Sequence, residues 1–243
     1  MRQKIIFIIS FCLIGTAFYL VFFKRELLQI YYSSFGTQLP GNASILGIDI
    51  SHHQGDINWE AALNMKIRSD SVQFVYLKVS EGIHFTDPKY AQNRKILDQN
   101  KVKVGVYHFF LPNINARQQA HHFIKSFRKT SLKPVVDVET KGHLNKKALV
   151  DSVSIFIETV KQELKVTPII YTNESFYKNY FKKSSLSKSI FWIASYKRHC
   201  KLFDLPNVIA WQFSDKGTIN GIAEKVDLNV AKTTFWEKAL WPK

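Results

Sequence analysis

The chain has 243 residues, and 34 lysines and arginines against 19 aspartates and glutamates give it a formal net charge of +15. A basic chain suits an anionic polymer or surface as partner, but its lysines are scattered and it carries no short nucleic-acid-binding motif, so nucleic acid is not the expected partner. Of the two cysteines, Cys12 lies in an N-terminal apolar run and Cys200 is alone in the remainder, which excludes a disulfide within the expected domain.

The N-terminal apolar run extends from Ile5 to Phe23 without a charged residue, and basic residues flank both of its ends. It is long enough to cross a bilayer. We therefore expect residues 1–25 to be a transmembrane anchor or a signal segment. The anchor is favoured, because the run is longer than the apolar part of a signal peptide and offers a poor cleavage site. Residues 26–44, which include Gly36, Pro40 and Gly41, are expected to form a linker, and residues 45–243 a single domain.

Short apolar runs of strand length recur throughout the expected domain. The predicted strands are Ile45–Ile50, Phe74–Val79, Val104–Phe110, Pro134–Glu139, Pro168–Thr172, Ile190–Ser195, Val208–Phe213 and a weak one around Val226–Leu228. Stretches with helical character follow the first five strands, at Asn58–Lys66, Pro88–Asn100, Ala116–Lys129, Asn145–Leu164 and Ser175–Phe181. Alternation of strands and helices predicts a parallel sheet, and eight strands predict a closed barrel. The fold class is therefore α/β, a degenerate TIM-like (β/α)5(β)3 barrel.

The fourth predicted strand ends in Asp137-Val138-Glu139. Strand side chains alternate between faces, so the two carboxylates should share one face with Cβ atoms about 6.5–7 Å apart. Repulsion between them raises one pKa until that group can donate a proton near neutral pH. An isolated Asp-x-Glu is more often the polar start of a loop, so the other strands must decide between the two interpretations.

In a barrel of this kind the functional groups lie at the carboxyl ends of the strands. Carboxylates, aromatic rings and amides occur there along most of the chain, and the candidate site residues are Asp49, Tyr107, Asp137, Glu139, Tyr171, Trp192, Trp211, Gln212, Asp227 and Asn229. Rings that stack on sugars and carboxylates that act on a glycosidic oxygen are typical of carbohydrate-cleaving clefts. Taken singly, Trp192 and Trp211 would more often be core residues.

Ordered motifs across residues 46–230 carry a resemblance to a known family. They are Gly47-Ile48-Asp49-Ile50-Ser51 with Gln54-Gly55, Lys78-Val79-Ser80-Glu81-Gly82, Gly105-Val106-Tyr107-His108-Phe109, Asp137-Val138-Glu139, Ile170-Tyr171-Thr172, Trp192-Ile193-Ala194-Ser195-Tyr196, Trp211-Gln212-Phe213-Ser214, Gly217, Gly221-Ile222 and Asp227-Leu228-Asn229. In their order they resemble the motifs of the family 25 glycoside hydrolases, the Chalaropsis-type lysozymes. Val79, Ser80 and the pair His52-His53 depart from the usual family pattern.

The resemblance implies a muramidase that cleaves the β-1,4 bond between N-acetylmuramic acid and N-acetylglucosamine in peptidoglycan. It implies that Glu139 is the proton donor and that Asp137 assists at the anomeric carbon, with Asp49 and Asp227 completing the catalytic carboxyls. The expected partner is then the peptidoglycan glycan strand, in the cell envelope, with residues 5–23 in a membrane. The protein is expected to be a monomer without a cofactor. A metal is not expected either, because adjacent histidines such as His52 and His53 rarely share one.

The stereochemical course stays open at this point. Strand geometry puts the two carboxyls between the separations of retaining and inverting enzymes. We favour a substrate-assisted course with retention, in which the 2-acetamido group of the sugar is the nucleophile and Asp137 stabilises the intermediate. The competing hypothesis from another class is a non-catalytic glycan-binding barrel of the cell envelope, which would be free to lose Glu139.

Overall fold

The computed structural model describes residues 19, 31–32, 38–39, 45–66, 71–100, 102–197 and 199–242. The predicted membrane segment, residues 5–23, lies outside the described residues except for Tyr19. Among the residues that are described, no helix combines the length and the apolar character needed to cross a membrane. In the predicted linker, strands β1 (Tyr31–Tyr32) and β2 (Gln38–Leu39) form a short antiparallel pair.

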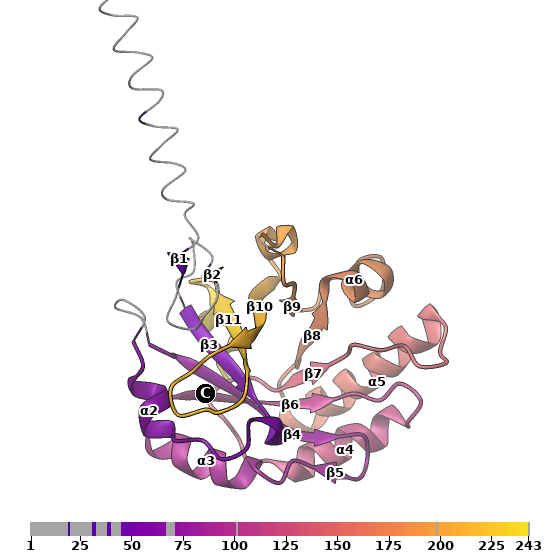
Figure 1. Cartoon of the computed structure of the whole chain (residues 1–243). Helices are drawn as coiled ribbons and strands as arrows, with labels where there is room; N and C mark the ends of the chain where they lie inside the picture. Colours follow the sequence, from indigo (N-terminus) through magenta and orange to yellow (C-terminus); the bar gives the residue numbers. More distant parts are fainter. Residues whose placement is uncertain are drawn as a thin grey trace, which may run out of the picture.

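Every one of the eight predicted strands is present, and together they close a barrel (Figure 1). In the order in which they pair, the strands are β3 (Ile45–Ile50), β4 (Phe74–Glu81), β6 (Lys103–Phe109), β7 (Val135–Asp137), β8 (Ile169–Asn173), β9 (Phe191–Ala194), β10 (Val208–Gly217) and β11 (Val226–Ala231), and β11 returns to β3. A two-residue strand that the sequence pattern did not reveal, β5 (Phe85–Thr86), pairs with the end of β4.

The last strand corrects the prediction of a parallel sheet. The seven strands from β3 to β10 pair in parallel, whereas β11 runs antiparallel to both β10 and β3. The connection between β10 and β11 contains no helix, and a short connection between neighbouring strands permits only antiparallel pairing. As a consequence, the N-terminal end of β11 lies at the same mouth of the barrel as the carboxyl ends of the other strands.

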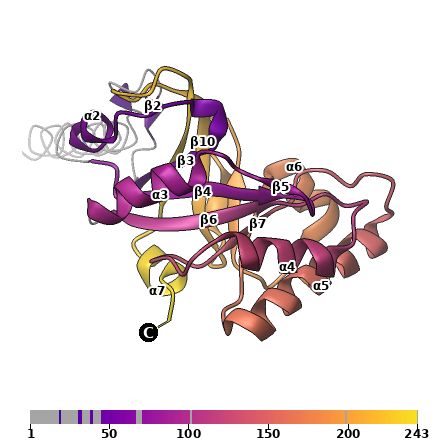
Figure 2. The same ribbon diagram turned by 90° about the horizontal axis from the view of Figure 1, so that it is seen from below.

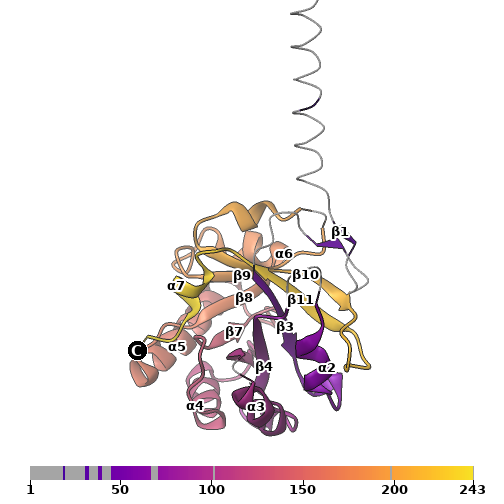
Figure 3. The same cartoon turned by 90° about the vertical axis from the view of Figure 1, so that its left-hand side faces the viewer.

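The five predicted helices are present, the first four with shorter bounds and the last beginning one residue earlier than predicted. They are α2 (Trp59–Asn64), α3 (Tyr90–Gln99), α4 (Ala116–Ser126), α5 (Lys146–Leu164) and α6 (Glu174–Phe176), and α6 continues as the π-helix η2 (Tyr177–Phe181). Three short helices were not predicted: η1 (His52–Gln54), η3 (Lys201–Asp204) and α7 (Phe235–Ala239). Figures 2 and 3 show that α3, α4 and α5 lie along the outside of the barrel.

Capping explains where α5 begins but not where α3 begins. The Asn145 side chain accepts a hydrogen bond from the Ala148 backbone N–H, as expected for an N-cap. Helix α3 was expected to begin at Pro88 with Asp87 as its N-cap, but it begins at Tyr90 and its cap residue, Lys89, makes no side-chain bond. The Asp87 carboxylate instead binds the Lys89 backbone N–H and the ring of His52.

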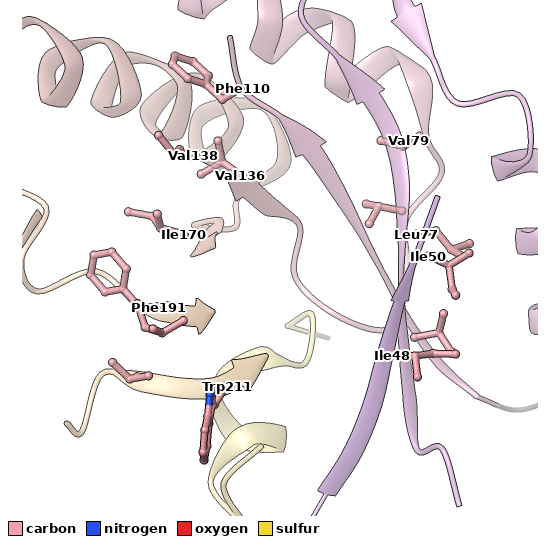
Figure 4. Packing of buried hydrophobic residues seen from close by; sticks show 14 of the residues in the cluster. Ile48, Ile50, Leu77, Val79, Phe110, Val136, Val138, Ile170, Phe191 and Trp211 are labelled. Carbon is pink, nitrogen blue, oxygen red and sulfur yellow. The ribbon is translucent and has the colours of Figure 1, made fainter. Parts of the chain in front are cut away.

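Each strand contributes one face to an outer core layer and the other to the barrel interior, because successive side chains point to opposite faces. The outer layer packs between strands and helices, and residues such as Ile48, Leu77, Val136 and Phe191 are buried in it (Figure 4). Helix α5 contributes Val153, Phe156 and Val160, among others, to the same layer.

The barrel interior is filled by side chains in its lower part, at the amino ends of the parallel strands. Buried rings of Phe74, Tyr76 and Trp192 pack there with Phe235 of α7. Gly105 makes room for these rings, since a Cβ at this position would lie 2.1 Å from the Tyr76 ring, and Gly47 is equally close to Phe74. The filled lower part leaves an open cavity at the carboxyl ends.

Candidate active site

A cavity of about 260 Å³ opens at the mouth where the parallel strands end. Its lining residues come from all eight barrel strands or the segments directly after them: Asp49, Ser51, His53, Gln54, Lys78, Tyr107, Phe109, Val135, Asp137, Glu139, Tyr171, Trp192, Tyr196, Gln212 and Asp227. Eight of the ten sequence-predicted site residues are therefore brought together, including all four carboxyls. Trp211 and Asn229 are the two that do not line the cavity.

Strand β7 places Asp137 and Glu139 on the cavity side. Val138 between them is fully buried in the outer core, and its backbone N–H donates to the Tyr171 carbonyl oxygen (2.9 Å) of β8. The Thr172 hydroxyl donates to the Val138 carbonyl oxygen (2.6 Å). These bonds continue the extended backbone past Asp137, so both carboxyls face the cavity as the alternation predicts.

The antiparallel direction of β11 places the other two carboxyls opposite each other. Asp49 near the end of β3 and Asp227 near the start of β11 are paired residues in the strand register. In a parallel β11, a residue near the start of the strand would lie at the closed end of the barrel. The meeting of Asp49 with Asp227 therefore depends on the reversal of this last strand.

Asp49 is held by two amide side chains. Gln212 Nε2 and Asn229 Nδ2 both donate to Asp49 Oδ2, at 3.0 and 2.7 Å. Asn229 is fully buried beneath the cavity floor, where its Oδ1 accepts from Trp192 Nε1 (2.9 Å). Asn229 thus reaches the site through Asp49, although it does not line the cavity.

Burial raises the pKa values of all four carboxyls, and neighbouring carboxylates add to the rise at Asp137, Glu139 and Asp227. Burial, and then the charges of Glu139 and Asp49, raise the pKa of Asp137 well above its usual range. Burial and the charge of Asp49 raise the pKa of Glu139, against a hydrogen bond with Asp137 that lowers it. Burial and Asp49 raise the pKa of Asp227 to about 9. Burial raises the pKa of Asp49 too, while its bonds to Asn229 and Gln212 oppose the rise.

Among the residues that the structure describes, Lys78 is the one lysine or arginine that lines the cavity. Its Nζ lies 2.6 Å from Glu81 Oε2 and 5.1 Å from the centre of the Phe109 ring. Its charge lowers the pKa of Asp137 but is partly balanced by Glu81. A single cation cannot keep four neighbouring carboxyls ionised, so protons are retained in the cavity near neutral pH.

Trp211, which was expected in the cleft, lies outside the cavity in the structure. Its side chain is 3% exposed and packs against Phe203 and Phe213 in the outer core, and its Nε1 donates to the Ser195 carbonyl oxygen (2.6 Å). The neighbouring Gln212 faces the cavity, and two successive strand residues cannot share a face. The alternation rule, applied to this pair, would have excluded one of them.

Sequence reasoning did not include Tyr196, Lys78 or His53 among the site residues, although all three line the cavity. Tyr196 and Lys78 belong to the motifs that carry the family resemblance, and their place in these motifs could have identified them as site residues. His53 stacks on His52, with ring centres 4.1 Å apart. His52 pairs with Asp87. In the adjacent pair His121-His122, the first pairs with Glu163 and the second contacts the Phe85 carbonyl oxygen.

A closed eight-stranded barrel whose mouth gathers paired carboxyls and aromatic rings is an arrangement found in glycoside hydrolases. The sequence model for glycosyl hydrolases family 25 matches residues 48–222. The chain belongs to this family.

Individual relatives agree with the family assignment. The protein YegX of Escherichia coli O6:H1 is 29% identical over 97% of this chain and 93% of its own length. The autolytic lysozyme of Clostridium acetobutylicum is 30% identical over 75% of this chain and 54% of its own length. Among solved structures, a family 25 glycosyl hydrolase from Bacillus anthracis is 26% identical and superposes with a TM-score of 0.71, covering 82% of this chain and 94% of that one.

Proposed function

We propose that the protein is a peptidoglycan hydrolase, a muramidase that cleaves the β-1,4 bond between N-acetylmuramic acid and N-acetylglucosamine. The observation that carries the proposal is the pair Asp137 and Glu139, which share the cavity and both have raised pKa values. Relatives called autolytic lysozyme and lysozyme M1, the latter from Streptomyces globisporus, support the substrate class.

Glu139 acts as the general acid and then as the general base. Its raised pKa keeps the proton available near neutral pH. Its carboxyl is also less buried than that of Asp137, which suits a group that must reach both the leaving oxygen and a water molecule. In the first step Glu139 protonates the glycosidic oxygen as the bond to the anomeric carbon breaks. In the second step the ionised Glu139 takes a proton from the attacking water.

Asp137 serves the anomeric side of the reaction. It is 6% exposed, and within the described part of the chain its Oδ1 is buried without a hydrogen-bond partner. A buried oxygen without a partner is costly unless a ligand supplies a donor. The N–H of a 2-acetamido group is such a donor. Asp137 therefore orients the acetamido group, and the carbonyl oxygen of that group attacks the anomeric carbon.

The resulting course is two displacements at one carbon, with net retention of the β configuration. The acetamido oxygen forms the first bond as the glycosidic oxygen leaves with the proton of Glu139, and water then opens the cyclic intermediate. An NMR time course of the first product anomer tests this course. Initial release of the α anomer would instead make Asp137 the base for a single inverting step.

The function is tested by digesting purified peptidoglycan with the wild-type protein and with Glu139→Gln. Borohydride reduction of the products should convert new reducing ends to muramitol, because a muramidase frees the muramic acid end. Glu139→Gln should lower the rate by about two to four orders of magnitude. The control Glu163→Gln changes the same chemistry at a half-exposed glutamate that pairs with His121, and should keep the wild-type rate. New glucosaminitol in place of muramitol would contradict the proposal.

We further propose that the barrel domain, residues 45–243, acts in the cell envelope as a monomer, with residues 1–25 as its anchor and residues 26–44 as a linker. The apolar run from residue 5 to residue 23 supports this arrangement. Fractionation of cells that express the full chain or residues 26–243 tests it. The full chain should sediment with membranes and resist extraction by salt, whereas recovery of both forms in the soluble fraction would rule out the anchor.

A further inference from the structure

Two amide groups converge on a single oxygen of Asp49. Gln212 Nε2 and Asn229 Nδ2 approach Oδ2 from β10 and β11, and all three side chains are at most 7% exposed. An ionised carboxylate accepts two such bonds at one oxygen, and hydrogen bonds to a charged group are stronger than those between neutral groups. The arrangement favours the ionised form of Asp49 in a cavity where burial opposes it.

An outer set of donors fixes the direction of both amides. The indole N–H of Trp192 can only donate, so the Asn229 atom that it contacts must be the oxygen, and the Asn229 nitrogen must face Asp49. Gln212 Oε1 lies 2.8 Å from the Tyr171 hydroxyl and 2.8 Å from the Tyr196 hydroxyl. Two phenols that donate to this oxygen leave the Gln212 nitrogen to bond Asp49.

We propose that Gln212 and Asn229 are positioning residues that hold Asp49 as the ionised member of the carboxyl cluster, with Trp192, Tyr171 and Tyr196 locking their amides in the donating direction. This inference rests on the proposed function, since it gives the charge of Asp49 a task in the reaction. It also gives the five residues a role besides direct contact with a sugar.

The charge of Asp49 acts on its neighbours across the cavity. Several titratable groups share the cavity with Asp49. They are His53 of η1, Lys78 of β4, Tyr107 of β6, Asp137 and Glu139 at the end of β7, Tyr171 of β8, Tyr196 after β9 and Asp227 of β11, and Asp215 of β10 acts on Asp227. Among these, Glu139 owes part of its raised pKa to Asp49. Loss of the Asp49 charge should therefore let Glu139 release its proton at lower pH.

The experiment uses Gln212→Met, which keeps the length of the side chain and removes the donor, in the full chain. Without that donor Asp49 holds its proton to higher pH, so the acidic limb of the pH profile for kcat/KM moves up. Asp49 is still ionised at the pH where Glu139 releases its proton, so the basic limb stays in place. The acidic limb should shift by about one pH unit, the scale of one lost bond to a charged group. The control Gln118→Met alters an exposed glutamine of α4 and should leave the profile unchanged.

The two phenols provide a second, milder test. Because both donate to Gln212 Oε1, either one suffices to hold the amide, so Tyr171→Phe and Tyr196→Phe should each shift the acidic limb little. The double variant should shift this limb as much as Gln212→Met. The control Tyr177→Phe removes a hydroxyl from η2, outside the cavity lining. Shifts in the double variant that equal the sum of the single ones would overturn the shared role.

Carbon-13 NMR titration of the carboxyls tests the same inference without an activity measurement. The Asp49 signal, assigned with Asp49→Asn, should titrate at higher pH in Gln212→Met than in the wild type. An unchanged Asp49 titration in a variant with a wild-type thermal midpoint, or a Gln212→Met enzyme that is slower with an unshifted acidic limb, would overturn the inference. A wild type that titrates as expected but does not cut peptidoglycan would instead refute the proposed function alone.

Discussion

The inner and outer faces of the same eight strands differ in how their polar groups are satisfied. On the outer face His108 is fully buried, yet its ring nitrogens lie 2.8 Å from the Ser80 hydroxyl and 3.3 Å from Gln119 Oε1, and the ring stacks on Phe156. On the inner face four carboxyls share one cavity with a single lysine, and Asp137 Oδ1 has no partner among the described residues. The outer face is arranged for stability, and the inner mouth keeps charges that oppose folding.

The closed end of the inner face provides the largest expected effect on stability. Gly105→Ala puts a Cβ 2.1 Å from the Tyr76 ring, which is held by a hydrogen bond from its hydroxyl to the Lys133 carbonyl oxygen. We expect the free energy of unfolding in urea to fall by about 3 kcal/mol, the upper part of the range for overpacked cores. Combining Gly105→Ala with Tyr76→Leu should cost less than the two separate changes together. A simple sum would mean that the two positions do not compete for space.

The outer face provides the next effect. Trp211→Phe removes a donor to the Ser195 carbonyl oxygen and part of a buried ring, so we expect a loss of about 2 kcal/mol in the free energy of unfolding. Because Trp211 does not line the cavity, KM for peptidoglycan and the pH limbs should match the wild type. An increase in KM with unchanged stability would indicate that Trp211 contacts the substrate, as expected from the sequence.

The pair Trp211 and Gln212 illustrates which parts of the site could be predicted. Apolar runs rich in β-branched residues locate all eight strands, and the rule that functional groups follow parallel strands brings the carboxyls together. Composition does not reveal strand direction, so the reversal of β11 that sets Asp227 opposite Asp49 was not predictable from the run itself. The alternation of faces was available in the sequence and assigns Trp211 to the opposite face from Gln212.

Contacts between distant residues account for the remaining differences. Asp87 has the form of an N-cap for α3, but its carboxylate bonds the backbone and ring of His52, which lies 35 residues earlier. Strand β5 has only two residues and pairs with the end of β4, too short for any periodic pattern. Neither feature has a local signal, because each depends on a segment that the fold brings alongside.

The inner mouth can be made more stable at the expense of activity. Burial and the charge of Asp49 raise the pKa of Asp227 to about 9, so at neutral pH folding requires this carboxyl to take up a proton. Asp227→Asn removes that requirement. We expect the thermal midpoint to rise by about 2–8 °C at pH 7, which corresponds to roughly 1–2 kcal/mol in a domain of this size. The rate of peptidoglycan cleavage should fall. A lower midpoint would show that the ionised form of Asp227 is stabilising.

The last expected effect is a change in the slope of stability against pH, and its sign differs between the two faces. Burial lowers the pKa of His108 from 6.5 to about 3, so this outer residue contributes stability that is present above pH 6.5 and is lost as the pH falls toward 3. The raised pKa of Asp227 acts oppositely: its contribution is present below pH 3.8 and is lost as the pH rises toward 9. Between about pH 4 and 6.5 the two contributions therefore oppose each other.

Removing one contribution should reveal the other. In Asp227→Asn, the free energy of unfolding should fall more steeply on acidification from pH 6.5 to 4 than in the wild type, by up to about 1.4 kcal/mol per pH unit. In His108→Gln the slope should change in the opposite direction, whatever the loss of stability at neutral pH from its hydrogen bonds. Urea titrations at several pH values measure both slopes. Equal slopes in all three proteins would mean that neither group changes its protonation on folding, and the contrast between the two faces would then rest on packing alone.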